Sequence, residues 1–110
     1  MIELIIKEYL DKNIDVPVYL QEQESMPESF ILFEKTSSGQ RDKINSATFA
    51  FQSYGKSMYE AAKLNDELKL IMFQMVELDE IGGVKLNSDY NFTDTTTKRY
   101  RYQAVFNITY

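Results

Sequence analysis

Hydrophobic and polar residues alternate most regularly near the end of the chain, over Arg99–Tyr110. A period of two is typical of a β-strand with one buried face, and a shift of one residue would invert the buried set. The register of this strand is therefore expected to be strongly fixed, with Val105 as the one apolar residue on the polar side. The predicted core side consists of Tyr100, Tyr102, Ala104, Phe106, Ile108 and Tyr110, and the polar side of Arg99, Arg101, Gln103, Asn107 and Thr109.

A second pattern, with steps of three and four residues, predicts a helix over Ser57–Glu77. Ser57 and Glu60 form a capping-box motif at its start, in which each side chain accepts a hydrogen bond from a free backbone N–H group. Leu70 and Phe73 lie at the flanks and widen the apolar stripe, which suits packing against a sheet. The stripe itself consists of Ala61, Leu64, Leu68, Ile71, Met72 and Met75.

The chain before this helix predicts another helix and several strands. The segment Ile2–Lys12 has its apolar residues on one side and predicts a short helix that covers the sheet. Pro17 places the short strand Val16–Leu20 at a sheet edge, or marks the start of the strand. The polar segment Gln21–Glu28 predicts a loop, and Phe30–Lys35 predicts a strand that is apolar on both faces before it emerges into solvent.

Four further segments alternate between polar connections and strands. The polar segment Thr36–Lys43 predicts a loop between two strands, or a long hairpin tip. Ile44–Tyr54 predicts a half-buried strand, with Ala47, Phe49 and Phe51 on its core side. Val84–Phe92 predicts a strand, and the polar segment Thr93–Lys98 connects it to the last one. The expected apolar side of the strand Val84–Phe92 consists of Val84, Leu86, Tyr90 and Phe92.

This order predicts an α+β domain that spans residues 1–110, in the sequence α-β-β-β-α-β-β. Short connections favour antiparallel hairpins. We therefore expect a mixed or mainly antiparallel sheet of about five strands, with both helices on one face. The other sheet face carries Thr, Gln, Arg and Asn, and is left for water or for a partner.

The formal net charge of −5 indicates that the protein as a whole repels nucleic acid. The first ten residues carry charges inside their apolar pattern and predict no signal peptide. No apolar run is long enough to predict a membrane span. We expect a soluble protein that is made in the cytoplasm and stays there, or becomes part of something assembled there.

The chain contains neither cysteine nor histidine. It therefore lacks disulfides, thiolate nucleophiles, zinc sites of the usual kinds and the bases of Ser–His or Cys–His catalysis. No phosphate-binding glycine motif is present. We expect neither an enzymatic activity nor a cofactor.

An acidic cluster follows the main helix at Glu77, Asp79 and Glu80. Hard cations need several convergent oxygen ligands, which three carboxylates in a helix end and turn do not provide by themselves. The pattern favours a solvated acidic turn, and no metal site is expected.

A basic and aromatic run stands at the start of the last strand, where Tyr100 and Tyr102 are interleaved with Lys98, Arg99 and Arg101. Such a run can bind nucleic acid by phosphate contacts and stacking. On a strand, however, the Tyr and Arg side chains point to opposite faces. A strand face that is solvated or contacts another subunit is therefore favoured.

Four long motifs resemble those of one protein family. They are NSATFAFQSY, SMYEAA, LNSDYNFTDTTT and YRYQAVFNIT, and they occur in the family's order over nearly the whole chain. The family comprises the tail completion, tail terminator or minor structural proteins of the neck of long non-contractile-tailed phages and prophages of Gram-positive bacteria. The part of this chain that resembles the family least is Gln21–Glu28.

The resemblance implies a tail-terminator-like fold and a structural virion protein of the siphophage neck. Such proteins form a ring, expected to be a hexamer, that terminates the tail tube and joins it to the head-side connector or stopper. The implied partners are further copies of the chain, the tail tube protein and the connector, with DNA only in transient passage and no membrane. The resemblance implies no enzyme activity and no cofactor.

An alternative is a small non-enzymatic protein-binding module, or a head–tail stopper or adaptor of the same particle. For the ring, two polar segments are the candidate interface with the next subunit or with the tail tube, because they lie in a connection and on the expected outer sheet face. These residues are Ser37, Ser38, Gly39, Gln40, Arg41, Lys43, Lys98, Arg99, Arg101 and Gln103.

Overall fold

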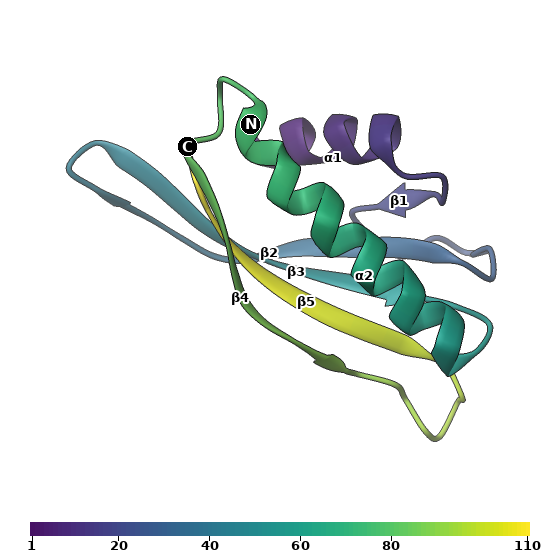
Figure 1. Cartoon of the computed structure of the whole chain (residues 1–110). Coiled ribbons are helices and arrows are strands. Elements are labelled where there is room, and N and C mark those ends of the chain that lie inside the picture. Colours follow the sequence, from purple (N-terminus) through teal and green to yellow (C-terminus); the bar gives the residue numbers. More distant parts are fainter.

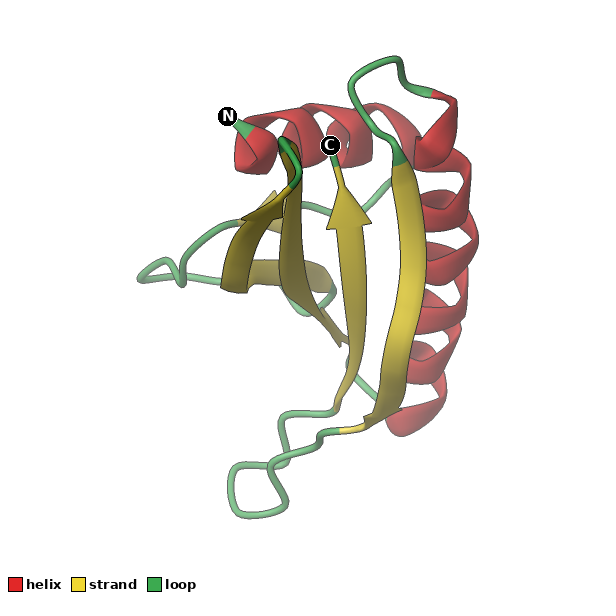
Figure 2. Cartoon of the chain, turned by 90° about the vertical axis from the view of Figure 1, so that its left-hand side faces the viewer, coloured by secondary structure: helices red, strands yellow, loops and turns green.

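The computed structural model describes the whole chain, Met1–Tyr110, as a five-stranded mixed sheet with two helices packed on one face (Figures 1 and 2). The predicted α+β class and element order are confirmed. The elements are α1 Ile2–Asn13, β1 Val18–Tyr19, β2 Phe30–Arg41, β3 Ile44–Tyr54, α2 Met58–Gln74, the 3₁₀ turn η1 Met75–Glu77, β4 Gly83–Asn91 and β5 Arg101–Thr109. Neither helix combines the length and the apolar character needed to cross a bilayer.

The strand order across the sheet is β1-β2-β3-β5-β4. The last strand of the chain, β5, lies between β3 and β4 and is antiparallel to both. The two-residue strand β1 pairs parallel with β2 at one edge of the sheet. This edge position agrees with the prediction made from Pro17. The sheet is therefore antiparallel except at this one edge pair.

The core lies between the helices and the sheet and forms one cluster of 18 buried residues. The rings of Phe33 and Phe51 stack at a centroid distance of 5.2 Å, and Phe106 meets Phe51 edge-on at 5.8 Å. α1 contributes Ile2, Ile6 and Leu10, and α2 contributes Leu64, Leu68 and Met72. Burial of these side chains stabilises the helices on this face by roughly 1.5–3 kcal/mol each.

The start of α2 follows the predicted cap only in part. The Oγ of Ser57 accepts a hydrogen bond from the N–H group of Glu60 at 3.2 Å, but the reciprocal bond to the Glu60 carboxylate is not formed. Gly55 lies so close to the helix that a Cβ atom there would stand 2.6 Å from the backbone nitrogen of Ala61. A glycine is therefore required at this turn.

The prediction of a loop over Thr36–Lys43 is wrong, although a hairpin tip was the alternative. Strand β2 continues to Arg41 and pairs with β3 from Ser37 to its end, after a bulge between Lys35 and Ser37. Only Asp42 and Lys43 form the turn, with φ angles of 51° and 66°. The segment lacks an apolar pattern because this half of β2 is exposed throughout, whereas its backbone hydrogen bonds to β3 still hold it as a strand.

The predicted facing of the fourth strand is wrong beyond its midpoint. A bulge between Leu86 and Ser88 shifts the register of β4 against β5. Tyr90 therefore lies opposite Gln103 on the sheet face away from the helices, while Leu86 stays on the core side. Phe92 follows Tyr90 onto this outer face, where the two rings meet edge-on at 5.9 Å. The extra residue of a bulge inverts the alternation, and this cannot be seen in the sequence pattern.

The same bulge turns Asp89 toward the helices. Its carboxylate accepts a hydrogen bond from Nζ of Lys69 on α2 at 3.1 Å, and Lys69 also pairs with Asp66 at 3.3 Å. Burial lowers the pKa of Lys69, but these two carboxylates outweigh it and hold the pKa above its usual value. This flank of α2 therefore faces strand β4.

The predicted core side of the last strand is confirmed at its centre and incomplete at its start. Ala104, Phe106 and Ile108 are fully buried. Tyr100 and Tyr102 are only half-buried, because they lie at the end of the sheet where α2 begins and its cover stops. Tyr110, at the other end, packs partly against the core.

Candidate functional site

The outer face is the sheet face opposite to the two helices, and three strands place polar side chains on it. Gln103 of β5 lies between Gln52 of β3 and Tyr90 of β4 in the register. Arg101 lies two residues earlier on the same side of β5, next to Tyr54. The predicted facing of Arg101 and Gln103, away from the core, is confirmed.

A chain of hydrogen bonds connects these five side chains across the sheet. Nη1 of Arg101 donates to Oη of Tyr54 at 2.9 Å, and the Tyr54 hydroxyl donates to Oε1 of Gln52 at 3.1 Å. The Gln52 amide donates to Oε1 of Gln103 at 3.0 Å. The Gln103 amide then donates to Oη of Tyr90 at 2.5 Å. Because each side chain holds its neighbour, the surface is ordered before any partner arrives.

Aromatic rings and guanidinium groups form the second part of this surface. The rings of Phe30 and Tyr54 stack at a centroid distance of 4.3 Å, and Tyr54 is only 4% exposed. The guanidinium carbon of Arg99 lies 4.9 Å from the centre of the Tyr54 ring. That of Arg101 lies 4.5 Å from the centre of the Phe92 ring. Cations at these distances are attracted by the negative faces of the rings.

Arg99 and Arg101 thus share a surface with aromatic residues, but not with those the sequence suggested. Tyr100 and Tyr102 alternate with the Arg residues, and neither takes part in the ring contacts of Arg99 and Arg101. The aromatic partners are instead Tyr54 of β3 and Phe92, which directly follows β4. Only the order of strands in the sheet brings them together, and local alternation in the sequence carries no signal for it.

A hollow of about 630 Å³ adjoins this surface, at the end of the sheet where α2 begins. Charges of both signs line it, and an exposed ion pair between Arg99 and Glu22, at 2.9 Å, crosses from the strand side to the loop Gln21–Glu28. An exposed pair of this kind contributes little to stability. Lining residues are Glu22, Glu24, Glu28, Lys56, Lys98 and Arg99.

The connection between β4 and β5 is an ordered turn. The Asp94 carboxylate accepts hydrogen bonds from the backbone N–H groups of Thr96 and Thr97. Hydrogen bonds from Thr97 and Thr96 hold the pKa of Asp94 below its usual value. The Thr93 hydroxyl bonds the backbone of Arg101. Lys98 closes the turn with a φ of 57°. The turn thereby fixes where β5 begins.

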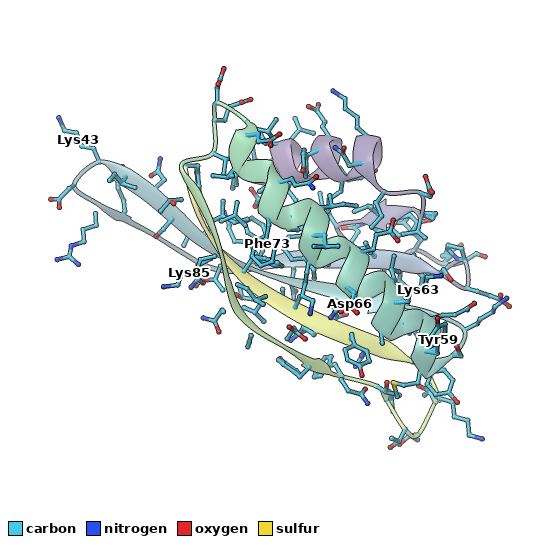
Figure 3. The ribbon with its side chains drawn as sticks, viewed as in Figure 1. Lys43, Tyr59, Lys63, Asp66, Phe73 and Lys85 are labelled. Atoms are coloured by element: carbon cyan, nitrogen blue, oxygen red, sulfur yellow. The ribbon has the colours of Figure 1, made fainter.

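The ten candidate contact residues fall into two separate groups. The first group lies on the outer face or next to it, and consists of Lys98, Arg99, Arg101 and Gln103. The β2 residues and Lys43 lie on the hairpin of β2 and β3, whose tip projects beyond the rest of the sheet (Figure 3). The pairs Tyr54–Arg101 and Ser46–Thr109 are eight residues apart on β3, so the two groups are separated by roughly 27 Å. The molecule therefore presents two contact surfaces and not one.

The acidic residues Glu77, Asp79 and Glu80 are all exposed at the turn between α2 and β4. No group of three or more acidic side chains converges with the geometry of a metal site. No protein-family model matches this chain, and no curated protein matches it.

Proposed function

We propose that this protein is a structural component of the neck of a long non-contractile-tailed phage. It forms a ring that terminates the tail tube and joins it to the head-side connector. The four motifs quoted above support the family, and the α+β fold agrees with a tail-terminator-like domain. The observation that carries a contact role for the chain is the hydrogen-bonded outer face.

The outer face has the chemistry of a protein-contact surface. Tyr, Arg and Phe are enriched at interfaces, where they supply most of the binding energy. Here the exposed Tyr90 and the half-buried Arg101 belong to one hydrogen-bonded chain, in which the buried Tyr54 positions Arg101. Ordered side chains lose little rotamer entropy on binding, and this favours affinity. We assign this face to contact with the tail tube or the connector.

The hairpin of β2 and β3 supplies the second contact. Its residues from Glu34 to Lys43 are exposed, and its tip extends farther from the helices than any other segment (Figure 1). A polar ribbon of this kind can reach a neighbouring subunit without first unfolding. The acidic total charge would let DNA pass through the channel of the ring without adhering. The mature location is the virion, after assembly in the host cytoplasm.

A second candidate is a stopper, an adaptor or a small non-enzymatic binding module of the same fold. The observation that favours it is that one chain completes its own core, so a single subunit already presents the outer face. Neighbouring genes for a tail tube protein and a connector would favour the ring. Their absence would favour the binding module.

Deletion of the gene tests the neck assignment. We expect separate heads and tails, or tails of uncontrolled length, in electron micrographs of lysates. Plaque formation should return when the wild-type gene is supplied in trans. Normal infectious virions from the deletion strain would refute the proposal.

A further inference from the structure

Two open edges remain in the sheet. β4 is the last strand on one side and has no partner beyond it over Gly83–Asn91. On the other side, β1 pairs only with Ile31 and Leu32 of β2, so the rest of β2 is unpaired along its outer edge. The backbone N–H and C=O groups of such an edge are a template for another strand.

The directions of the strands match for pairing between copies. β2, β3, β5 and β4 are successive antiparallel neighbours, so β4 runs opposite to β2. When a second copy is placed beside the first in the same orientation, its β2 meets β4 of the first in antiparallel fashion. We propose that Ser37–Arg41 of one copy pairs with Gly83–Leu86 of the next.

The bulges select these two segments. β2 is regular from Ser37 to Arg41, beyond its bulge, and β4 is regular from Gly83 to Leu86, before its bulge. Both segments lie at the same end of the sheet, since Gly83 and Ser46 pair with the same residue, Thr109. Bulges and the lysines near them prevent indiscriminate edge pairing and restrict it to the regular segments.

Charge is complementary at this end. The hairpin turn carries Arg41 and Lys43, which leave it net positive despite Asp42. The turn before β4 carries the exposed residues Asp79 and Glu80. The proposed pairing places the basic turn of one copy beside the acidic turn of the next. Opposite charges across a contact guide association and favour one register.

The helix layer above β4 also has room for a neighbour. Phe73 of α2 is 43% exposed, and its ring meets Phe106, which pairs with Leu86 of β4. In Figure 3, Phe73 and Lys85 lie nearer the hairpin tip than Tyr59 does. A strand added to β4 would cover Phe73. Ser38 faces the helix side of β2, because it pairs with the buried Ala47, and it is small enough to lie beneath the Phe73 ring.

This contact joins two different surfaces, so its repetition in one direction closes a ring or extends a filament. It deepens the proposed function by naming the partner of the hairpin as a second copy of the chain, and it rests on that function for its biological setting.

Cysteine cross-linking tests the pairing, because the chain has no cysteine of its own. The variant that combines Gly39→Cys and Lys85→Cys places one thiol on each edge. Within one chain these positions are three strand spacings apart, roughly 14 Å, which exceeds the reach of a disulfide. Oxidation is expected to give linked dimers and larger multimers. The control combines Lys85→Cys with Glu8→Cys on the exposed side of α1, and a yield no higher than this control overturns the proposal.

Charge reversal tests the placement of the two turns. In the Gly39→Cys and Lys85→Cys variant, we expect Arg41→Glu with Lys43→Glu to reduce the multimer yield about tenfold. Reversal of the opposite turn in the same chain, by Asp79→Lys with Glu80→Lys, should restore it. Absence of rescue overturns this placement. A neck defect on gene deletion without any cross-link would leave the neck function standing and remove only the edge pairing.

Discussion

Arg101 and Tyr54 hold each other at the junction of the two central strands. The guanidinium of Arg101 donates to the Tyr54 hydroxyl at 2.9 Å, and that hydroxyl donates onward to Gln52. Tyr54 is buried beneath the stacked ring of Phe30. One phenol oxygen therefore connects the cationic and amide parts of the outer face.

Tyr54→Phe should remove this connection and keep the packing of the ring. We expect a loss of about 1 kcal/mol in the free energy of unfolding, because one acceptor and one donor disappear from a half-buried network. Urea denaturation followed by circular dichroism measures it. Tyr59→Phe is the control, since Tyr59 is 73% exposed and should lose nothing. Equal effects of the two changes would show that the hydroxyl network carries no stability.

Arg101→Glu should leave the chain folded and impair assembly. The side chain lies on the outer face, so reversal of its charge disturbs contacts with a partner more than the core. Plaque counts from a deletion strain supplied with the variant should fall, while the far-ultraviolet spectrum stays that of the wild type. Lys12→Glu makes the same charge change at an exposed position of α1 and should complement fully. Full complementation by Arg101→Glu would exclude the outer face as a contact.

Gly55→Ala should destabilise the domain by about 1–3 kcal/mol. The new Cβ atom would stand 2.6 Å from the backbone nitrogen of Ala61, and backbone cannot move aside as a flexible side chain does. Gly39→Ala is the matched control, because its Cβ atom would meet only the Ser46 hydroxyl at 3.8 Å. Guanidinium unfolding of the two variants compares them directly. A tolerated Gly55→Ala would mean that α2 begins farther from the strand.

Lys43→Gly should stabilise the hairpin. Lys43 has a φ of 66°, in the left-handed region that costs an L-residue roughly 1–2 kcal/mol and glycine almost nothing. We expect a gain of about 0.5–1 kcal/mol by chemical denaturation, reduced by the greater entropy of glycine in the unfolded chain. Ile44→Gly, one residue further and within β3, should instead destabilise. A loss of stability in both variants would contradict the turn.

Glu3→Gln should weaken the pH dependence of stability in acid. The backbone N–H of Glu3 and, after it, Lys35 lower the pKa of this carboxyl below 4.5 against the opposing effect of burial. A lowered pKa means that its contribution is present above pH 4.5 and is lost as the pH falls through the folded-state value. The contribution of a partly exposed pair is below about 1 kcal/mol. Unfolding at several pH values measures it, and Glu8→Gln, whose side chain is exposed and unpaired, should keep the wild-type profile.

The sequence was sufficient wherever a signal is local. The Ser57 cap, the apolar stripe of α2 and the buried centre of β5 all follow from the spacing of neighbouring residues. Periods of 3.6 and 2 determine which side of an element is apolar before any tertiary contact forms. The element order and the fold class were therefore predictable, and so was the polar outer face.

Only the tertiary structure determined how distant strands meet. The bulge at Leu86 and Ser88 turns Tyr90 to the outer face, and the placement of β5 beside β3 brings Arg101 to Tyr54. The strand character of Ser37–Arg41 also comes from pairing with β3 and not from an apolar pattern. Register and strand order are properties of backbone hydrogen bonds between segments far apart in the chain. The hydrophobic pattern of each segment reports only whether a neighbour covers it.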